Sequence, residues 1–203
     1  SKSSITDIKK LKRDADLYVL AVPDDAIAGV VKSMPALKGT VVHTSGTIGM
    51  DALKKFASRG VFYPLQSFSK EHAVTITAFP ICIEGSSKQV VEALMECAGG
   101  INKNAYVLDS AQREVVHLAA VFANNFSNHM FAIADDILAH SNISFDLVRP
   151  LILETAFKAM DMIPADAQTG PAFRGDKKIV KHHAEMLKSD DDIAKLYKQL
   201  SKS

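Results

Sequence analysis

Three polar side chains recur along one apolar stretch of the sequence and could supply proton-transfer chemistry. His117, Asn124 and Asn128 stand at intervals of seven and four residues, which in an α-helix keeps them within one narrow stripe. Because the neighbouring residues are strongly apolar, we expect a largely buried helix whose polar groups need partners. The favoured interpretation is a catalytic stripe, with His117 as proton donor and Asn124 as an orienting amide beside Asn128. A structural polar network is the alternative.

Two predicted strand ends could bind a ligand. Residues 17–22 form a continuous apolar run that stops at Pro23, and the run at 40–43 leads into Thr44, Ser45 and Gly46. In an open parallel sheet, ligands bind beyond the carboxyl ends of the strands. One interpretation of Val22–Pro23 is a rigid turn that lies beside a flat ring of the ligand. The alternative, equally compatible with the residues, is a plain strand-to-helix turn in which Asp24 or Asp25 caps the helix. The segment from His43 to Gly46 offers three polar side chains and a close backbone approach.

A loop near the C-terminus holds one further candidate. Arg174 stands among small residues in the segment 169–176 and could bind a carboxylate or phosphate of a small-molecule substrate. Alternatively, Arg174 pairs with Asp176 and fixes the turn. The two cysteines, Cys82 and Cys97, have no metal or redox spacing, and no metal site is predicted.

The elements that must position these residues fall into two halves. Eight of the ten glycines lie in residues 1–100, and none lies between Ile101 and Thr169. Short apolar runs fill the first half and long helical periodicity the second, which predicts an α/β domain (1–109) followed by an all-α domain (110–203). The first is a partial Rossmann-type parallel sheet lacking its first strands, and the second is a helical substrate and dimerisation domain. The expected strands lie at 17–22, 40–43, 61–63, 80–84 and 105–108. The first expected helix begins near residue 24 and runs through Val31. The other expected helices lie at 50–58, 88–98, 110–140, 145–162, 176–188 and 190–200.

Composition excludes several classes of protein. With 24 basic and 23 acidic residues, the net charge is +1, so no field of one sign draws nucleic acid or an anionic membrane. No apolar run approaches the roughly 18 residues of a membrane span, and no signal-peptide core follows Ser1. We therefore expect a cytoplasmic protein without nucleic-acid or membrane partners.

Five segments carry a resemblance to a known family. They are ADLYVLAVPDDAI at 15–27, HTSG at 43–46, YPLQSFSK at 63–70, HLAAVFANNFSNH at 117–129 and QTGPAFRGD at 168–176. In this order they resemble a bacterial family that pairs a Rossmann-like domain with a helical C-terminal domain of unassigned function. Its members are described as NADP oxidoreductases dependent on coenzyme F420, and they look related to pyrroline-5-carboxylate reductases and β-hydroxyacid dehydrogenases.

The resemblance implies an enzyme that passes hydride between NADP(H) and a small carbonyl or imine, or a deazaflavin. The implied cofactor-binding residues are Val22, Pro23, His43, Thr44, Ser45 and Gly46. The family's Gly-x-Gly-x-x-Gly turn, which binds pyrophosphate, has no counterpart in these residues. We therefore expect a further segment before Ser1, and the assignment of NADP rests on the resemblance. A non-catalytic dinucleotide-sensing or dimerisation module is the alternative function.

A homodimer through the helical domain is also predicted. This domain carries more apolar residues than one thin layer can bury against itself. They are Val115, Leu118, Phe122, Phe126, Phe131, Ile133, Leu138, Leu151, Ile152 and Phe157.

Overall fold

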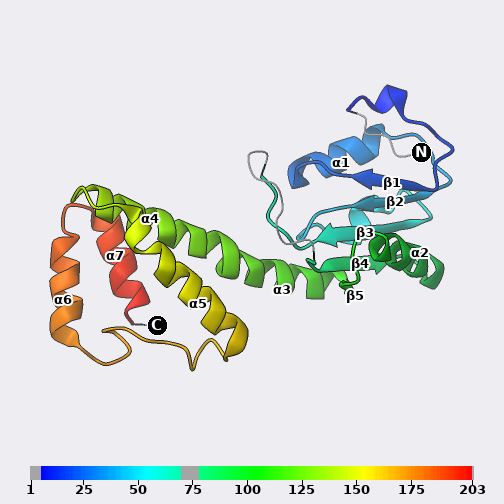
Figure 1. Ribbon diagram of the computed structural model, residues 1–203. Coiled ribbons are helices and arrows are strands. Elements are labelled where there is room, and N and C mark those ends of the chain that lie inside the picture. The colour runs from blue at the N-terminus through cyan, green and yellow to red at the C-terminus, as the bar shows by residue number, and fades with distance from the viewer. Residues whose placement is uncertain (1–5, 70–77, 203) are drawn as a thin grey trace. The chain divides into compact units, whose positions relative to one another are not determined.

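The computed structural model describes residues 6–69 and 78–202 and divides into two compact units, 1–125 and 126–203 (Figure 1). Lys70, the last residue of one segment of the family resemblance, lies outside the described residues. The change from α/β to helical structure comes at Ser110, where helix α3 begins. The expected fold class, an α/β part followed by a helical part, is confirmed. A functional boundary between Asp109 and Ser110 stays a prediction.

The first unit is built on a five-stranded sheet in the order β1-β2-β3-β4-β5. The strands are β1 (Leu17–Leu20), β2 (Thr40–His43), β3 (Arg59–Pro64), β4 (Ile81–Gly85) and β5 (Ala105–Val107). Strands β1 to β3 are parallel, β3 and β4 are antiparallel, and β4 and β5 are parallel.

The prediction of an entirely parallel sheet is therefore wrong at one place. The backbone N–H of Leu65 donates to the carbonyl of Pro80 at 2.8 Å, so β3 ends and β4 begins at the same end of the strands. A parallel partner would instead require a crossover back along the sheet. The β4-α2-β5 unit that follows is parallel, as expected.

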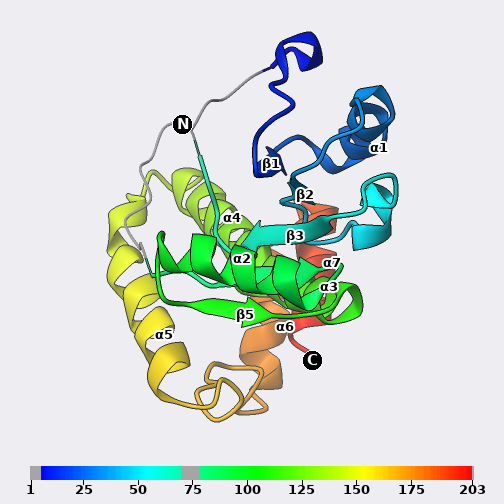
Figure 2. The same cartoon turned by 90° about the vertical axis from the view of Figure 1, so that its right-hand side faces the viewer.

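Helices cover both faces of the sheet. Helix α1 (Asp24–Ser33) and the short 3₁₀ helix η2 (Met50–Leu53) pack on one face, in a core with Leu20 and Val41. Helix α2 (Lys88–Gly99) packs on the other face against Val42, Ile81 and Ile83 (Figure 2). A further 3₁₀ turn, η1 (Ile8–Lys10), precedes β1.

Two local expectations on the first face are wrong. The helix predicted at 50–58 is only the single 3₁₀ turn η2, because β3 already begins at Arg59 and leaves no room for a longer helix. Neither Asp24 nor Asp25 caps α1. Pro23 occupies the cap position with φ −53° and ψ 149°, and both aspartates lie inside the first turn, where a negative charge is favourable.

A long helical run begins at a capping box formed by Asp109 and Gln112. It comprises α3 (Ser110–Ala120), a π-helical segment η3 (Val121–Phe126) and α4 (Ser127–Ala139). The expectation that this helix is largely buried is wrong for the single chain. Arg113 is the one buried residue of α3, and Val115 and Leu118 are 67% and 58% exposed. The reason is that the described residues of the first unit supply no second layer over this side of α3.

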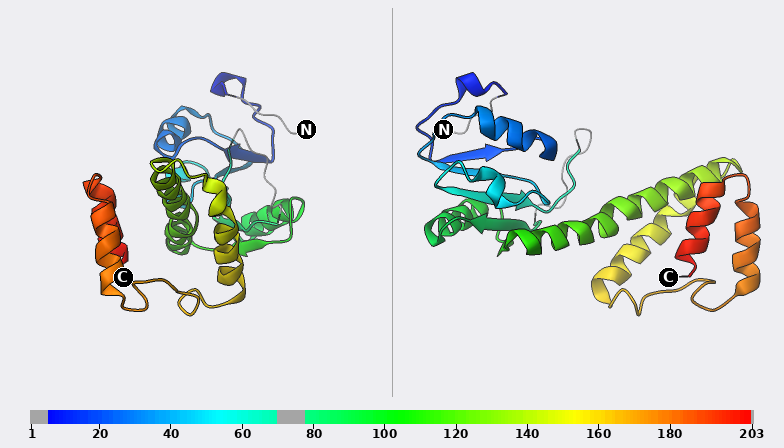
Figure 3. Two further views of the ribbon diagram at one scale, coloured as in Figure 1. Left: turned by 60° about the vertical axis from the view of Figure 1, so that its left-hand side comes forward. Right: turned by 180° about the vertical axis from the view of Figure 1, so that it is seen from behind.

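The remaining helices belong to the second unit. They are η4 (Phe145–Leu147), α5 (Arg149–Asp161), α6 (Lys177–Met186) and α7 (Asp191–Leu200). Pro150 lies in the first turn of α5, where proline is tolerated, so the helix restarts there. Asp176 and Asp190 cap α6 and α7, which lie side by side (Figure 3). Within the described ranges, no helix is long and apolar enough to cross a membrane.

Candidate functional site

A row of side chains crosses the sheet on the face that also carries α1. Leu20 pairs with His43, His43 with Val61, and Val61 with Glu84, so these four residues lie on one face. Two residues further along β3, Tyr63 points to the same face. Because β2 ends at His43 and β3 ends at Pro64, the row and Tyr63 lie at the carboxyl ends of parallel strands, where open sheets bind ligands.

Arg113 fixes α3 to this face. Its side chain is 1% exposed and forms an ion pair with Glu84 of β4. Its guanidinium also donates to the carbonyl of Ile48 at 2.6 Å. Ser110 joins the same network, because its hydroxyl donates to the Glu84 carboxylate at 2.8 Å and accepts from the N–H of Met50 at 3.2 Å. The first turn of α3 is thereby tied to β4 and to the loop after β2.

His117 lies one turn after Arg113 and meets the sheet at Tyr63. The Tyr63 hydroxyl and Nδ1 of His117 are hydrogen-bonded at 3.0 Å, and the two rings meet edge to face. Both side chains are half-buried. Gly46 makes this contact possible, since a Cβ at this position would lie 2.5 Å from Nδ1 of His117 and 2.9 Å from Cζ of Tyr63.

Electrostatics keeps Tyr63 protonated. Burial raises the pKa of its hydroxyl above the usual value of 10.0. The neighbouring Cys82 and Asp24 raise this pKa further, and the positive Arg113 acts in the opposite direction. The pair therefore places a protonated phenol hydroxyl beside a ring nitrogen of His117, and two such groups can share a proton.

His43 is the innermost polar group of the row. It is fully buried, and its Nδ1 accepts a hydrogen bond from the N–H of Ser45 at 3.2 Å. Burial lowers the pKa of His43 below 6.5, and the positive charge of Arg113 lowers this pKa further. A hydrogen bond to the Gly49 backbone and the charges of Asp24 and Glu84 act in the opposite direction. His43 is thus a neutral ring whose proton lies on Nε2. It supports the loop that follows β2.

That loop is closed by its own side chains. The Ser45 hydroxyl accepts from the N–H groups of Thr47 and Ile48 at 3.1 and 2.9 Å, and the Thr44 hydroxyl donates to the carbonyl of Leu20 at 3.4 Å. Thr47 donates to Asp24 at 2.7 Å, which joins the loop to the start of α1. Of the six predicted cofactor-binding residues, His43, Ser45 and Gly46 are buried, Val22 and Thr44 are half-buried, and Pro23 is exposed. Their role in cofactor binding stays a prediction.

The other predicted site residues lie further along the chain. Asn124 lies in η3 and Asn128 at the start of α4, and both are exposed. A π-helical turn contains more residues than an α-turn, so the α-helical spacing assumed for the stripe does not hold across η3, and the roles of Asn124 and Asn128 stay predictions. Arg174 is exposed in the second unit, and Asp176 accepts instead from the N–H of Ile179 at 3.3 Å. Asn128 and Arg174 belong to a different unit from His117.

Sequence reasoning missed four residues of this site: Tyr63, Glu84, Ser110 and Arg113. A signal existed for two of them. Tyr63 ends a predicted strand, and the strand-end rule applied to positions 22 and 43 extends to it. Arg113 precedes His117 by four residues and therefore shares its helix face.

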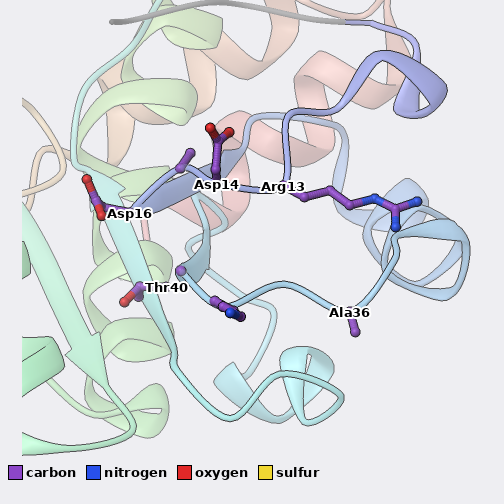
Figure 4. Close-up of a pocket in the computed structure, with 8 residues that line it drawn as sticks. Arg13, Asp14, Asp16, Ala36 and Thr40 are labelled. Carbon is purple, nitrogen blue, oxygen red and sulfur yellow. The ribbon is translucent and has the colours of Figure 1, made fainter.

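Two hollows in the first unit lie apart from the Tyr63–His117 pair. The larger, about 830 Å³, is at the amino ends of β1 and β2 and mixes Arg13 and Lys38 with Asp14 and Asp16 (Figure 4). It is therefore at the end of the parallel strands opposite to His43. The smaller, about 340 Å³, opens beside Ser110 and Glu84.

Comparison with known proteins identifies the family of this chain and solved structures with a similar fold. A family pattern described as "Domain of unknown function (DUF2520)" matches residues 79–203, and one described as "Rossmann-like domain" matches residues 1–67. A solved structure from Bacteroides fragilis, provisionally named an NADP oxidoreductase, is 38% identical to the chain. The match covers 98% of this chain and 78% of that one, with a TM-score of 0.89. The chain belongs to the DUF2520 family. The expected pairing of a Rossmann-like part with a domain of unassigned function is thereby confirmed.

More distant structures share the DUF2520 chain's fold alone. A Thermotoga maritima protein is 23% identical over 95% of this chain and 78% of its own, with a TM-score of 0.76. The 1-pyrroline-5-carboxylate reductase of Streptococcus pyogenes is 11% identical over 92% of this chain and 74% of its own, with a TM-score of 0.56. Comparison with curated proteins found no match.

Proposed function

We propose that this DUF2520-family protein is an NADP-dependent oxidoreductase that reduces a small carbonyl or imine, with His117 as the proton donor. The observation that carries the proposal is the position of His117. It is hydrogen-bonded to Tyr63 at the carboxyl ends of parallel strands, in the region where Rossmann-type sheets bind ligands. The name of the Bacteroides fragilis relative, an NADP oxidoreductase at 38% identity, supports the same reaction class.

The residues present fit one end of the cofactor better than the other. At the ends of β1 and β2, exposed Pro23 and half-buried Val22 and Thr44 offer small and apolar surface suited to a flat nicotinamide ring. The first turn of α1 instead carries Asp24 and Asp25, and carboxylates there oppose a phosphate. The pyrophosphate is therefore not assigned to α1, and Val22, Pro23 and Thr44 are proposed to hold the nicotinamide end.

Each residue has a distinct part in the proposed reaction. NADPH, when bound, supplies the hydride that reduces the substrate carbon. His117 gives a proton to the carbonyl oxygen or imine nitrogen as negative charge develops there. Arg113 and Ser110 keep α3, and with it His117, in a fixed position on the sheet. Asn124 and Asn128 are proposed to orient the substrate, and Arg174 to bind an anionic group on it.

A homodimer is part of the proposal. Leu153, Phe157 and Met160 follow one another at helical spacing on α5 and are 58%, 60% and 82% exposed. An apolar stripe of this kind is typical of a surface that a second subunit covers. We propose that the helical region forms this interface.

Ligand-dependent stability tests the reaction class. NADPH alone should raise the melting temperature of the complete protein, because a ligand that binds only the folded state stabilises it. Addition of small keto acids, cyclic imines or an oxidised deazaflavin should then lead to consumption of NADPH by at least one compound. Stabilisation by NADPH without consumption across the panel would favour a dinucleotide-sensing module. Absence of both effects would contradict the proposal.

A further inference from the structure

The contact between Tyr63 and His117 determines which ring nitrogen is available to a substrate. Nδ1 of His117 is 3.0 Å from the Tyr63 hydroxyl, and the same hydroxyl makes no second hydrogen bond within residues 6–69 and 78–202. A phenol O–H is a good donor to an acceptor within hydrogen-bond distance, and Nδ1 is such an acceptor when the neutral ring carries its proton on Nε2.

We infer that Tyr63 is a positioning residue that holds neutral His117 in the tautomer with its proton on Nε2, so that Nε2 is the nitrogen that meets the substrate. The use of that proton rests on the proposed function, whereas the tautomer does not. The raised pKa of Tyr63 supports the assignment, because the hydroxyl keeps the proton that it donates to Nδ1.

The hydroxyl also suits the protonated ring. When His117 becomes an imidazolium, the added proton is on Nδ1, and Tyr63 rotates its O–H so that its oxygen accepts from Nδ1. During reduction the Nε2–H bond breaks, and its proton bonds to the substrate oxygen or nitrogen that holds the new electron pair. The ring is left neutral with its remaining proton on Nδ1, donated to Tyr63. Uptake of one solvent proton at Nε2 regenerates the imidazolium, and loss of the Nδ1 proton to solvent returns the resting tautomer.

Gly46 defines the space in which the pair meets. Because a Cβ at position 46 would lie within 3.0 Å of both rings, an alanine there must separate them or shift the loop. Tyr63→Phe removes this hydrogen bond with little change in packing volume, and we expect Gly46→Ala to weaken it by pushing the two rings apart.

The chain supplies a matched control. In the second unit, Nδ1 of His183 is hydrogen-bonded to the Tyr197 hydroxyl at 2.9 Å, with the rings edge to face. Tyr197→Phe removes an equivalent hydrogen bond between α6 and α7, in a pair that is not part of the proposed site.

Nitrogen NMR of the protein with ¹⁵N-labelled histidine tests the inference without any substrate. The His117 signals are identified by their loss in His117→Gln. In the neutral ring we expect a proton on Nε2 and an unprotonated, hydrogen-bonded Nδ1. Tyr63→Phe should move the Nδ1 signal of His117 and leave that of His183 unchanged, and Tyr197→Phe should do the reverse. Gly46→Ala should reproduce the effect of Tyr63→Phe.

Two results would overturn the inference: a proton on Nδ1 in neutral wild-type His117, or a His117 spectrum that Tyr63→Phe does not change. Turnover is a separate readout. Tyr63→Phe should lower kcat by roughly 10-fold to 100-fold, as for partners that orient metal-bound histidines, with little change in KM for NADPH. If the tautomer is as expected but His117→Ala leaves turnover intact, the proposed function fails and the assignment of Tyr63 stands.

Discussion

Arg113 and Glu84 form an ion pair between α3 and β4 in which the arginine side chain is 1% exposed and the carboxylate 14%. Replacement of Arg113 by Met keeps the volume but leaves Glu84 partly buried without its cation. Loss of one partner of a buried pair typically costs about 3–5 kcal/mol. We expect a loss of this size in the free energy of unfolding, measured by urea denaturation.

The exposed pair of Lys158 and Glu154, at 3.2 Å on α5, is the control for Arg113. Lys158→Met should cost at most about 1 kcal/mol, because water already screens this pair. The double variant Arg113→Met/Glu84→Gln should be more stable than Arg113→Met alone, since no charge is then left unpaired. Equal costs for the two single variants would show that Arg113 does not hold α3 on the sheet.

Alanine substitutions at Gly46 and Gly29 should have opposite effects. At Gly46 the added methyl group would collide with His117 and Tyr63, and overpacking of this kind typically costs about 1–3 kcal/mol. At Gly29, inside α1, a Cβ meets nothing within 4 Å, and alanine should stabilise the helix by about 0.5–1 kcal/mol. Thermal unfolding of both variants checks the comparison. A Gly46→Ala protein as stable as the wild type would mean that the space beside His117 is open.

His43 should make the protein less stable as the pH falls below about 6.5. Its folded pKa lies below the 6.5 of the free side chain, so in mildly acidic solution the unfolded chain binds a proton that the folded chain does not. The free energy of unfolding then falls by up to about 1.4 kcal/mol per pH unit. Above about pH 7.5 both states are neutral and His43 contributes no pH dependence.

The measurement for His43 is urea unfolding between roughly pH 5 and pH 8. His43→Gln should flatten the slope below pH 6.5, whatever its effect on stability at pH 8. The other six histidines are common to both proteins and cancel in the comparison. Identical slopes for the two proteins would rule out a buried neutral His43.

The proposed dimer predicts a specific effect at Phe157. Sedimentation velocity at micromolar concentration should give twice the mass of the chain, because a stable interface buries about 1,600 Å² and needs apolar side chains at its centre. Phe157→Asp should shift the equilibrium to the monomer, and Lys158→Ala, at a polar position next to it, should not. A wild-type protein that sediments as a monomer would contradict the dimer.

The sequence predicts the local elements of this site better than their assembly. The strand that ends at His43 and the helix that carries His117 follow from hydrophobic runs and turn residues alone. The direction of β4 does not, because it depends on the close approach of Leu65 and Pro80 across a connection whose path no periodicity shows.

Arg113 illustrates why the network was missed. From sequence alone, an isolated arginine near a helix start is predicted to lie on the surface, because arginine is rarely buried unless it is paired. Its partner, Glu84, is 29 residues away on another element. Similarly, no sequence periodicity indicates the π-helical segment at 121–126, so the deviation from α-helical spacing near Asn124 could not be predicted.

The most direct test of the account is the rate of NADPH oxidation by the complete wild-type protein and by His117→Ala, with the best substrate of the carbonyl and imine panel. We predict that His117→Ala lowers kcat by roughly 10²–10⁴-fold, the usual contribution of a general acid, while its affinity for NADPH is unchanged. A His117→Ala protein that turns over as fast as the wild type would contradict the assignment of this site.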